Sequence, residues 1–224
     1  LDKTTCDVYE AGLGCNVSVS LPRWQVGEFE RISWTMWSSD TDIAVISDPT
    51  FIFTEDDWNI HRKLRIHAVN NNIDNADAAC KIHFKGSMSY LHHGGGAKNL
   101  TTTMLPVVSH NEDKSGWVVT KATGSICNEA MTLSHTFSVV LTSEPTHPVS
   151  IPVVPTVPSE GITCHSRVEC EADDKTRTLV FDANNWHTVQ VVTVTGRDDD
   201  VVDGTQPFDV LIGPSMSEDP MFEG

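Results

Sequence analysis

Histidine, serine and cysteine are the residue types in this chain that are suited to catalysis, and histidine and cysteine are also suited to holding a transition metal. Ten histidines are present, and His61, His67 and His83 fall on or beside expected strands. Their spacing matches no zinc motif such as H-E-x-x-H or C-x-x-C, and the sequence has no G-x-S-x-G turn or glycine-rich phosphate loop. We therefore expect these histidines to lie on strand surfaces, and we expect the chain not to be an enzyme.

The six cysteines offer a second kind of chemistry, which is disulfide formation. Cys164 and Cys170 lie close together in the segment ITCHSRVEC, a spacing that suits a disulfide within a local hairpin. The four other cysteines allow three pairings, and they are Cys6, Cys15, Cys80 and Cys127. An even number of cysteines is typical of proteins that fold in an oxidising compartment.

Two sequons for N-linked glycosylation support the same compartment. They are Asn16-Val17-Ser18 and Asn99-Leu100-Thr101, and neither has proline at the middle position. We expect glycans on Asn16 and Asn99. Together with the cysteines, they predict an extracellular or cell-surface glycoprotein.

The charge balance excludes several classes of partner. Fifteen basic residues against 31 acidic ones give a formal net charge of −16. Nucleic acids and anionic lipid surfaces both require a cationic footprint, so we expect neither as a partner. No apolar run approaches the roughly 20 residues that cross a bilayer, so we expect no membrane insertion.

The elements that position these residues occur twice along the chain. An aromatic-rich segment ending in tryptophan is followed by an alternating apolar strand, a polar turn and a second strand, which is the signature of a tandem repeat. The matched pairs are FIFTEDDW (51–58) with LVFDANNW (179–186), LRIHAV (64–69) with VVTVTG (191–196), and AACKIHF (78–84) with PFDVLIG (207–213).

Alternating apolar positions dominate both repeats, and no stretch keeps a helical period for three turns. Short strands separated by Gly, Pro, Asn and Asp clusters predict a β-sandwich in each half. We therefore expect an all-β chain of two tandem Ig-like β-sandwich domains, residues 1–113 and residues 114–224. No Gly/Ser-rich spacer separates the two halves.

The second half carries motifs that resemble Calx-beta-type repeats. They are Glu-Ala before a strand, F-x-x-x-x-W, V-T-V-x-G-x-D-D-x-x-x-D-G and S-x-D-P-x-F-x-G. The likeness covers nearly all of residues 117–224 and, more weakly, residues 6–116. It implies Ig-like sandwiches of the kind found in extracellular adhesive and structural proteins.

The resemblance also implies a calcium site and a disulfide arrangement. Calcium at the acidic turn of the second repeat would be held by carboxylates, and the alternative is a solvated turn; the candidate ligands are Asp198, Asp199, Asp200, Asp203 and Glu129. A Cys15–Cys80 bridge between sheets would resemble the Ig arrangement. Cys6 and Cys127 would then pair outside their own sandwiches, between domains or between subunits.

Compared with the first repeat, the second is one strand short. The first ends with a strand at residues 104–109, and no equivalent follows Phe222-Glu223-Gly224. An open sandwich edge invites an incoming strand. We expect either continuation of the parent chain or donation of a strand by the next subunit, from its N-terminal segment; the predicted interface residues are Asp2, Lys3, Thr4, Thr5, Asp7, Val8, Tyr9 and Glu10.

Two functions fit these observations. The first is an extracellular structural subunit, a glycosylated two-domain rod that forms a head-to-tail homo-oligomeric filament or stalk. The alternative is an adhesin module that recognises a glycan or protein through Trp24, Trp37 or the segment His92–Gly96. The repeat, the short join, the missing edge strand, the sequons and the absence of catalytic signals favour the first function.

Overall fold

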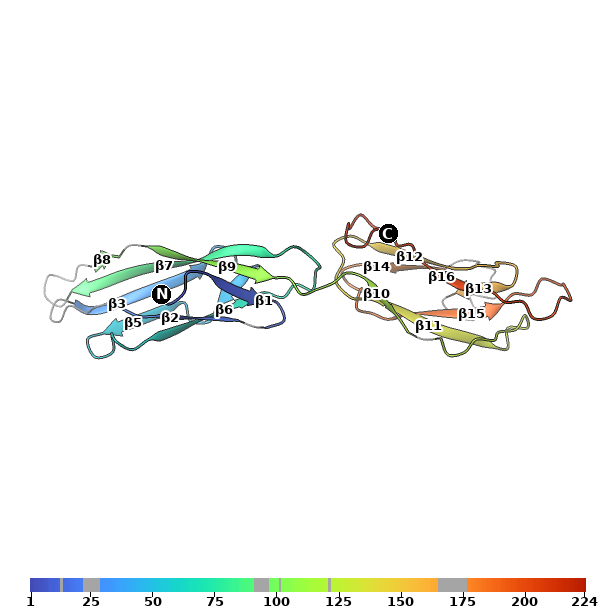
Figure 1. Cartoon of the computed structure of the whole chain (residues 1–224), viewed down its shortest axis with the longest axis horizontal. Coiled ribbons are helices and arrows are strands. Elements are labelled where there is room, and N and C mark those ends of the chain that lie inside the picture. Colours follow the sequence, from blue (N-terminus) through green and yellow to red (C-terminus); the bar gives the residue numbers. More distant parts are fainter. Residues whose placement is uncertain (13, 22–28, 91–96, 101, 121, 165–176) are drawn as a thin grey trace. The chain divides into compact units, whose positions relative to one another are not determined.

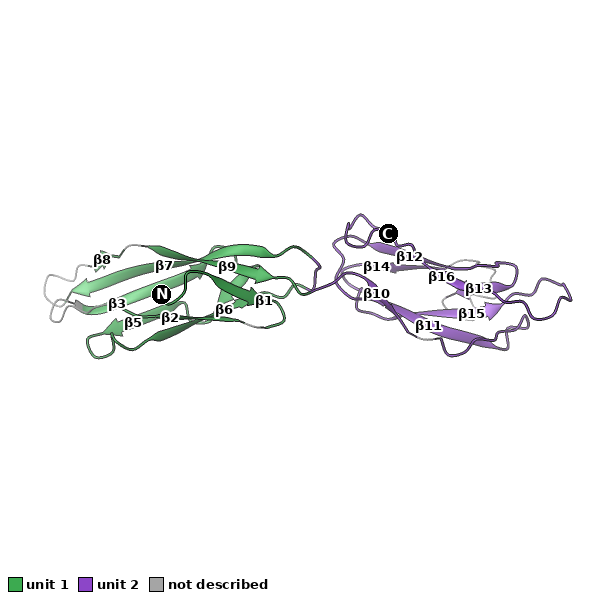
Figure 2. Cartoon of the chain, viewed as in Figure 1, with its two compact units in different colours: residues 1–71, 75–112 green, residues 72–74, 113–224 purple. Residues whose placement is uncertain are grey.

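The computed structural model of the chain describes residues 1–12, 14–21, 29–90, 97–100, 102–120, 122–164 and 177–224. Those residues contain strands and no helix, so the all-β prediction is confirmed (Figure 1). No helix that could span a bilayer occurs in the described part of the chain. The chain divides into two compact units, residues 1–71 with 75–112 and residues 72–74 with 113–224 (Figure 2).

Unit 1 is a sandwich of two sheets. One sheet has the order β1-β9-β7-β3-β5, with β8 also paired to β7, and the other has the order β2-β6-β4. The strands are β1 (Cys6–Tyr9), β2 (Cys15–Val19), β3 (Phe29–Ser38), β4 (Ala44–Ile46), β5 (Thr50–Thr54), β6 (Arg62–Ala68), β7 (Ala78–Tyr90), β8 (Ala97–Asn99) and β9 (Thr103–His110).

Unit 2 is also a sandwich of two sheets, with the orders β10-β11-β15-β13 and β14-β12-β16 among the described residues. Its strands are β10 (Trp117–Val119), β11 (Ser134–Leu141), β12 (Val149–Pro155), β13 (Gly161–Cys164), β14 (Arg177–Phe181), β15 (Gln190–Gly196) and β16 (Val210–Ile212).

The repeated sequence segments form matching strands in the two units. The segments around residues 51–58 and 179–186 contain β5 and β14, which pair with β3 and β12, respectively. The segment 78–84 forms the first part of β7, and the segment 207–213 contains β16; these two strands pair with the other edges of β3 and β12. The alternation that repeats in sequence therefore builds the same three-strand centre in each unit.

The alternating residues form one buried core in each sandwich. In unit 1 the fully buried side chains include Phe53, Leu64 and Phe84, and in unit 2 they include Ile151 and Phe181. The matched tryptophans at the ends of the repeated aromatic segments, Trp58 and Trp186, pack against these two cores.

The disulfides differ from the pairing predicted from the family resemblance. Cys6 is bonded to Cys15, so the predicted Cys15–Cys80 bridge and an external bond for Cys6 are both wrong. The reason is local: β1 and β2 are joined by a short turn that brings the two Cα atoms within 6.0 Å. Cys80 is a buried free thiol on β7 whose Sγ accepts a hydrogen bond from Ser38 Oγ at 3.7 Å.

The cysteines of unit 2 give a correction and a partial test. Cys127 is a free thiol within the chain, so the predicted bond to the other domain is wrong, and the predicted bond to another subunit stays a prediction. Cys164 is disulfide-bonded. Its predicted partner, Cys170, lies outside the described residues.

Candidate functional site

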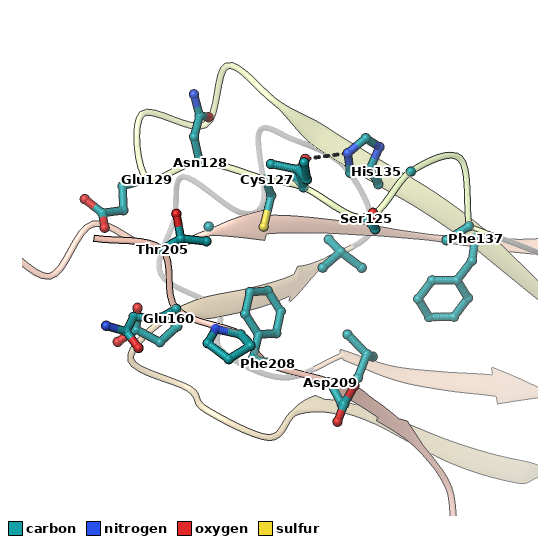
Figure 3. A pocket seen from close by; sticks show the side chains of 18 of the residues that line it. Ser125, Cys127, Asn128, Glu129, His135, Phe137, Glu160, Thr205, Phe208 and Asp209 are labelled. Atoms are coloured by element: carbon teal, nitrogen blue, oxygen red, sulfur yellow. Dashed lines mark hydrogen bonds between the residues drawn. The ribbon is translucent and has the colours of Figure 1, made fainter. Parts of the chain in front are cut away.

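A cavity of about 1080 Å³ opens in unit 2 between the two sheets (Figure 3). One wall is the segment 119–130, which leads from β10 to β11, and the opposite wall is the segment 204–212, which leads into β16 and forms it. The floor includes the apolar side chains of Phe137 on β11 and Val194 on β15. We call this cavity, with its two walls, the open groove.

The wall formed by β16 presents an unpaired strand edge. β16 pairs with β12 and with no other strand among the described residues. The amide of Gly213 donates to the carbonyl of Pro152, and the amide of Thr156 donates to the carbonyl of Asp209, both at 2.8 Å. Because hydrogen-bonded residues alternate in an antiparallel pair, the N–H and C=O groups of Val210 and Ile212 point to the opposite edge, into the open groove.

In unit 1 the position that corresponds to the open groove is filled by β9. This strand lies antiparallel to β7 and parallel to β1, so it occupies the space between them. Its inward side chains, Leu105 and Val107, are 0% and 1% exposed. In unit 2, β16 corresponds to β7, and the wall at residues 119–130 lies on the side where unit 1 has β1. The space between them, which β9 fills in unit 1, is the cavity.

The end of the chain does not fill the open groove. Met216 forms a bridge with Ser150 at the start of β12, and Phe222 is 3% exposed in the core of unit 2. The amide of Thr146 donates to the carboxylate of Asp219 at 2.7 Å. Residues 214–224 therefore close the sandwich beside the beginning of β12, whereas the open groove lies along β16.

Segment 119–130 is held against β11, and this keeps the open groove open on that side. The amide of Thr120 donates to the carbonyl of Ser138 at 2.9 Å, and the amide of Thr123 donates to the carbonyl of Thr136 at 3.0 Å. Farther along the segment, a His135 ring nitrogen is hydrogen-bonded to the carbonyl of Ile126 (Figure 3). Each of these bonds ties the wall to the floor of the groove.

Cys127 is a free thiol in the wall of the open groove (Figure 3). Burial raises the pKa of this thiol above its ordinary value. The thiol is therefore a natural chemical reporter of whether the groove is occupied, because an occupant would cover it.

Acidic side chains gather at one end of the open groove. Oxygens of Glu160, Asp199 and Asp203 lie within 4.8 Å of one another. Glu129 also belongs to this end: its side chain is exposed, and desolvation by nearby protein atoms, and then the negative charges of Asp199 and the neighbouring carboxylates, raise its pKa above the ordinary value. We call these four residues the acidic cluster. Figure 3 shows Glu129 and Glu160 at the same end of the groove.

The acidic cluster contains part of the calcium ligand set expected from the sequence. Asp199, Asp203 and Glu129 are present, and the charge of Asp198 also acts on Glu129, although Asp198 is not among the carboxylates that lie within 4.8 Å of one another; Asp200 is in neither group. The carboxylate of Asp198 instead accepts the amide of Asp200 at 3.2 Å, within the turn. The donor set consists of carboxylate oxygens, so it fits a hard cation such as calcium.

Sequence reasoning missed Glu160, which follows β12 and is 39 positions away from Asp199 in the chain. No local motif marks it. The only available signal was its place after an apolar strand and before Gly161, at the same edge of the sandwich as the acidic turn.

A glycine fixes one side of the acidic cluster. A side chain at Gly196 would meet the backbone carbonyl carbon of Asn128 at 2.6 Å, so only glycine lets the segment carrying Glu129 cross so close to the end of β15. This close approach brings Glu129 beside the acidic turn that follows β15.

The predicted donor segment is engaged within unit 1. Residues 6–9 form β1, and Val8 is fully buried. Asp2 exchanges hydrogen bonds with Ser18, through its amide at 3.2 Å and its carboxylate at 2.7 Å. The amide of Ala11, just beyond the segment, donates to the carboxylate of Glu112 at 2.8 Å. These residues, Asp2, Lys3, Thr4, Thr5, Asp7, Val8, Tyr9 and Glu10, are therefore not a free strand in this structure.

The other predicted sites lie on the surface of unit 1 or outside the described residues. Asn16 on β2 and Asn99 on β8 are both exposed, as a glycan acceptor must be. Trp37 is 43% exposed and stacks on His83, with ring centroids 5.2 Å apart. Trp24 and the segment His92–Gly96 lie outside the described residues.

Comparisons with known proteins give structural likeness only. No family model matches the chain, and no curated protein matches it. Among solved structures, CBD12 from CALX1.2 is similar over 97% of this chain and 80% of that chain, with 13% identity and a TM-score of 0.38.

Two further solved structures are similar over nearly the whole chain. The YadV chaperone matches 96% of this chain and 96% of that one, with 8% identity and a TM-score of 0.33. The D0-D1 domain of Intimin matches 96% of this chain and 94% of that one, with 12% identity and a TM-score of 0.29.

Proposed function

We propose that this chain is a structural module of an extracellular assembly, and that its second unit accepts a β-strand from another molecule. The observation that carries the proposal is the edge of β16 that pairs with no other strand in the described part of unit 2; this edge faces the open groove, where unit 1 has a paired strand. The Calx-beta-type resemblance of the sequence motifs agrees with a structural or adhesive role.

The physical reason for strand acceptance is the exposed backbone. Val210 and Ile212 offer two N–H and two C=O groups along one edge, above the apolar floor of Phe137 and Val194. An unpaired strand edge is a template for another strand. Main-chain hydrogen bonds then give affinity, and the apolar floor selects the side chains at alternate positions.

Such a contact would be heterologous, because it joins the open groove of unit 2 to a different surface of the next molecule. Heterologous contacts that do not close into rings propagate as filaments. The donor strand is not the folded N-terminal segment: residues 6–9 pair with β9, and the Cys6–Cys15 bond ties β1 to β2.

The extracellular setting is supported by the covalent chemistry of the chain. Cys6 is bonded to Cys15, and Cys164 is also disulfide-bonded. Disulfides persist in oxidising compartments. Both sequon asparagines, Asn16 and Asn99, lie on exposed positions where an attached glycan would meet solvent. Intact-mass analysis of the natural protein tests this, because unmodified asparagines at both sites would remove the support from glycosylation.

A proline on the open edge of β16 tests the proposed function. The amide of Val210 points away from β12, so Val210→Pro removes a donor from the open edge and leaves the β12 hydrogen bonds in place. We expect Val210→Pro to abolish association in sedimentation and electron microscopy, while the monomer, although less stable because Val210 packs against the core, still unfolds cooperatively on heating. The matched control is Leu211→Ala, which trims an exposed side chain on the outer face. Filaments of Val210→Pro as abundant as those of the control would contradict the proposal.

Ligand recognition by unit 1 is the second candidate function. The observation that favours it is the exposed Trp37 ring stacked on His83, because an exposed aromatic face is a common platform for a sugar ring or an aromatic side chain. A glycan that raises the unfolding temperature of the natural chain but not that of Trp37→Ala would support this function. If no glycan raises the unfolding temperature of the natural chain, glycan recognition by Trp37 is contradicted, and strand acceptance is then the function that is left.

A further inference from the structure

We infer that the strand accepted by unit 2 runs antiparallel to β16, places apolar side chains at alternate positions over the groove floor, and ends on a cationic residue beside the acidic cluster. This inference rests on the proposed function and names the chemistry of the partner. The template for it is β9 of unit 1, which already fills the corresponding position in its own sandwich.

The direction follows from the strands that flank the position. In unit 1, β9 is antiparallel to β7 and parallel to β1. In unit 2, β16 corresponds to β7, and segment 119–130 runs on the side of β1. A strand in the open groove therefore enters beside Ile212, travels along Val210, and reaches the acidic cluster with its C-terminal end.

The alternation follows from the floor of the open groove. In β9, Leu105, Val107 and Ser109 point inward and are buried, whereas the residues between them point outward. The floor in unit 2 includes Phe137 and Val194. Apolar side chains at two alternate positions of the donor would cover these residues, and charged side chains there would be desolvated without a partner.

The cationic end follows from the last residue of β9. His110 contacts the carboxylates of Asp77 and Asp7, at 2.7 and 3.3 Å. Asp77 belongs to the turn that precedes β7, and Asp7 belongs to β1. In unit 2 the turn that precedes β16 supplies Asp203, and the wall segment supplies Glu129.

A cation at the end of the donor strand in unit 2 would therefore face more carboxylates than His110 faces in unit 1. Carboxylate oxygens of Glu160, Asp199 and Asp203 lie within 4.8 Å of one another. A Lys or Arg side chain at the end of the donor would relieve the repulsion among the carboxylates and fix the register of the strand.

Synthetic peptides with the sequence of residues 103–111 of this chain, TMLPVVSHN, provide the probe. Binding of labelled peptides to the full chain is measured by fluorescence anisotropy with a chelator present, so that divalent ions do not occupy the acidic cluster. We expect the native peptide to bind and the Leu105→Asp, Val107→Asp peptide not to bind. We expect the His110→Lys peptide to bind roughly 3- to 10-fold more tightly than the His110→Glu peptide.

A variant of the acceptor isolates the charge contribution. In the double variant Glu160→Gln, Asp203→Asn, the ratio of the affinities for the His110→Lys and His110→Glu peptides should fall toward one. The Leu105→Asp, Val107→Asp peptide should still not bind. The control variant Glu218→Gln, Glu223→Gln changes the net charge equally, on exposed residues beside the start of β12, and should keep the ratio. Thermal unfolding of each variant verifies that it is folded.

Cys127 tests the direction of the strand. Peptides carry one cysteine, as Ser109→Cys or Thr103→Cys, in a mixed disulfide with thionitrobenzoate. The Cys127 thiolate displaces thionitrobenzoate as it forms the cross-link. The Ser109→Cys peptide should react faster, because its C-terminal end reaches the part of the wall that holds Cys127. Faster reaction of Thr103→Cys would overturn the predicted direction.

The outcomes separate the inference from the proposed function. If neither the native nor the His110→Lys peptide binds, strand acceptance itself fails. If the peptides bind with apolar alternation but with equal affinity for the Lys and Glu forms, the cationic end is wrong and strand acceptance stands. If the Glu160→Gln, Asp203→Asn variant still binds the Lys peptide more tightly than the Glu peptide by the same factor, the acidic cluster is not the site that distinguishes the two peptides.

Discussion

At the scale of single residues, His110 holds the N-terminal strand of unit 1 on β9. Its ring contacts Asp77 and Asp7 and stacks on Tyr9, with centroids 4.8 Å apart. The hydrogen bond to Asp77, with a smaller contribution from Asp7, raises the pKa of His110 above its ordinary value. The charged form of the ring is therefore favoured in the folded state.

The raised pKa of His110 predicts a pH dependence with a defined sign. Because the folded state binds the proton more tightly, the stabilisation is complete below the ordinary histidine pKa of about 6.5 and is lost as pH rises through the folded pKa. We expect urea unfolding of the natural chain to show this loss and that of His110→Gln to lack it. The other histidines are common to both proteins, so the difference between the two pH profiles isolates His110. Identical profiles would contradict the assignment.

Calcium is the second prediction at the residue scale. A divalent ion at the acidic cluster would relieve repulsion among Glu160, Asp199 and Asp203. At a calcium concentration of about 100 times Kd the expected stabilisation is about 2.7 kcal/mol, observed as a higher unfolding temperature. Asp199→Asn with Asp203→Asn should remove the response. Asp200→Asn is the matched control, because Asp200 lies outside the cluster. An equal calcium response in all three proteins would place the ion elsewhere.

At the scale of elements, the Cys6–Cys15 bond ties β1 to β2 across the two sheets of unit 1. A disulfide stabilises mainly by restricting the unfolded chain, and a loop of this length contributes about 2–3 kcal/mol. We expect Cys6→Ser with Cys15→Ser to lower the free energy of unfolding by that amount in denaturant titrations. Cys80→Ser is the control for loss of a buried thiol. No difference between the double variant and the natural chain would show that β1 is held by pairing alone.

The strands were largely predictable from sequence, because alternation of apolar residues has a direct physical cause. Segments 64–69 and 191–196 alternate and form the central strands β6 and β15 of their sheets. The cysteine pairing was not predictable, because it depends on the short turn that brings β1 beside β2. The family resemblance pointed to Cys80, which lies on β7 and is free.

The candidate site was predictable only in part, for the same reason. The acidic turn of unit 2 is visible in the sequence. Glu160 and the wall segment 119–130 reach the open groove through tertiary packing, and no spacing in the sequence marks them. Gly196 has no distinctive motif either, and its role depends on the backbone of Asn128 that crosses it.

At the scale of the whole molecule, the two units share their central strands and differ at one edge of the sheet. Unit 1 closes its sheet with β9 and β1, and a disulfide fixes that closure. Unit 2 repeats the central strands and leaves the edge of β16 beside an apolar groove with an acidic end. In the proposed assembly, this difference between the described parts of the two units would give each subunit a direction, because only unit 2 would accept a strand.

Amide hydrogen exchange at β16 tests strand acceptance most directly. The measurement compares the full chain expressed alone with the assembly purified from its natural source. The amides of Val210 and Ile212 should exchange rapidly in the chain alone and slowly in the assembly, whereas the amide of Leu211, which faces β12, should be protected in both. Rapid exchange at Val210 and Ile212 in the assembly, or protection of both in the chain alone, would contradict the account.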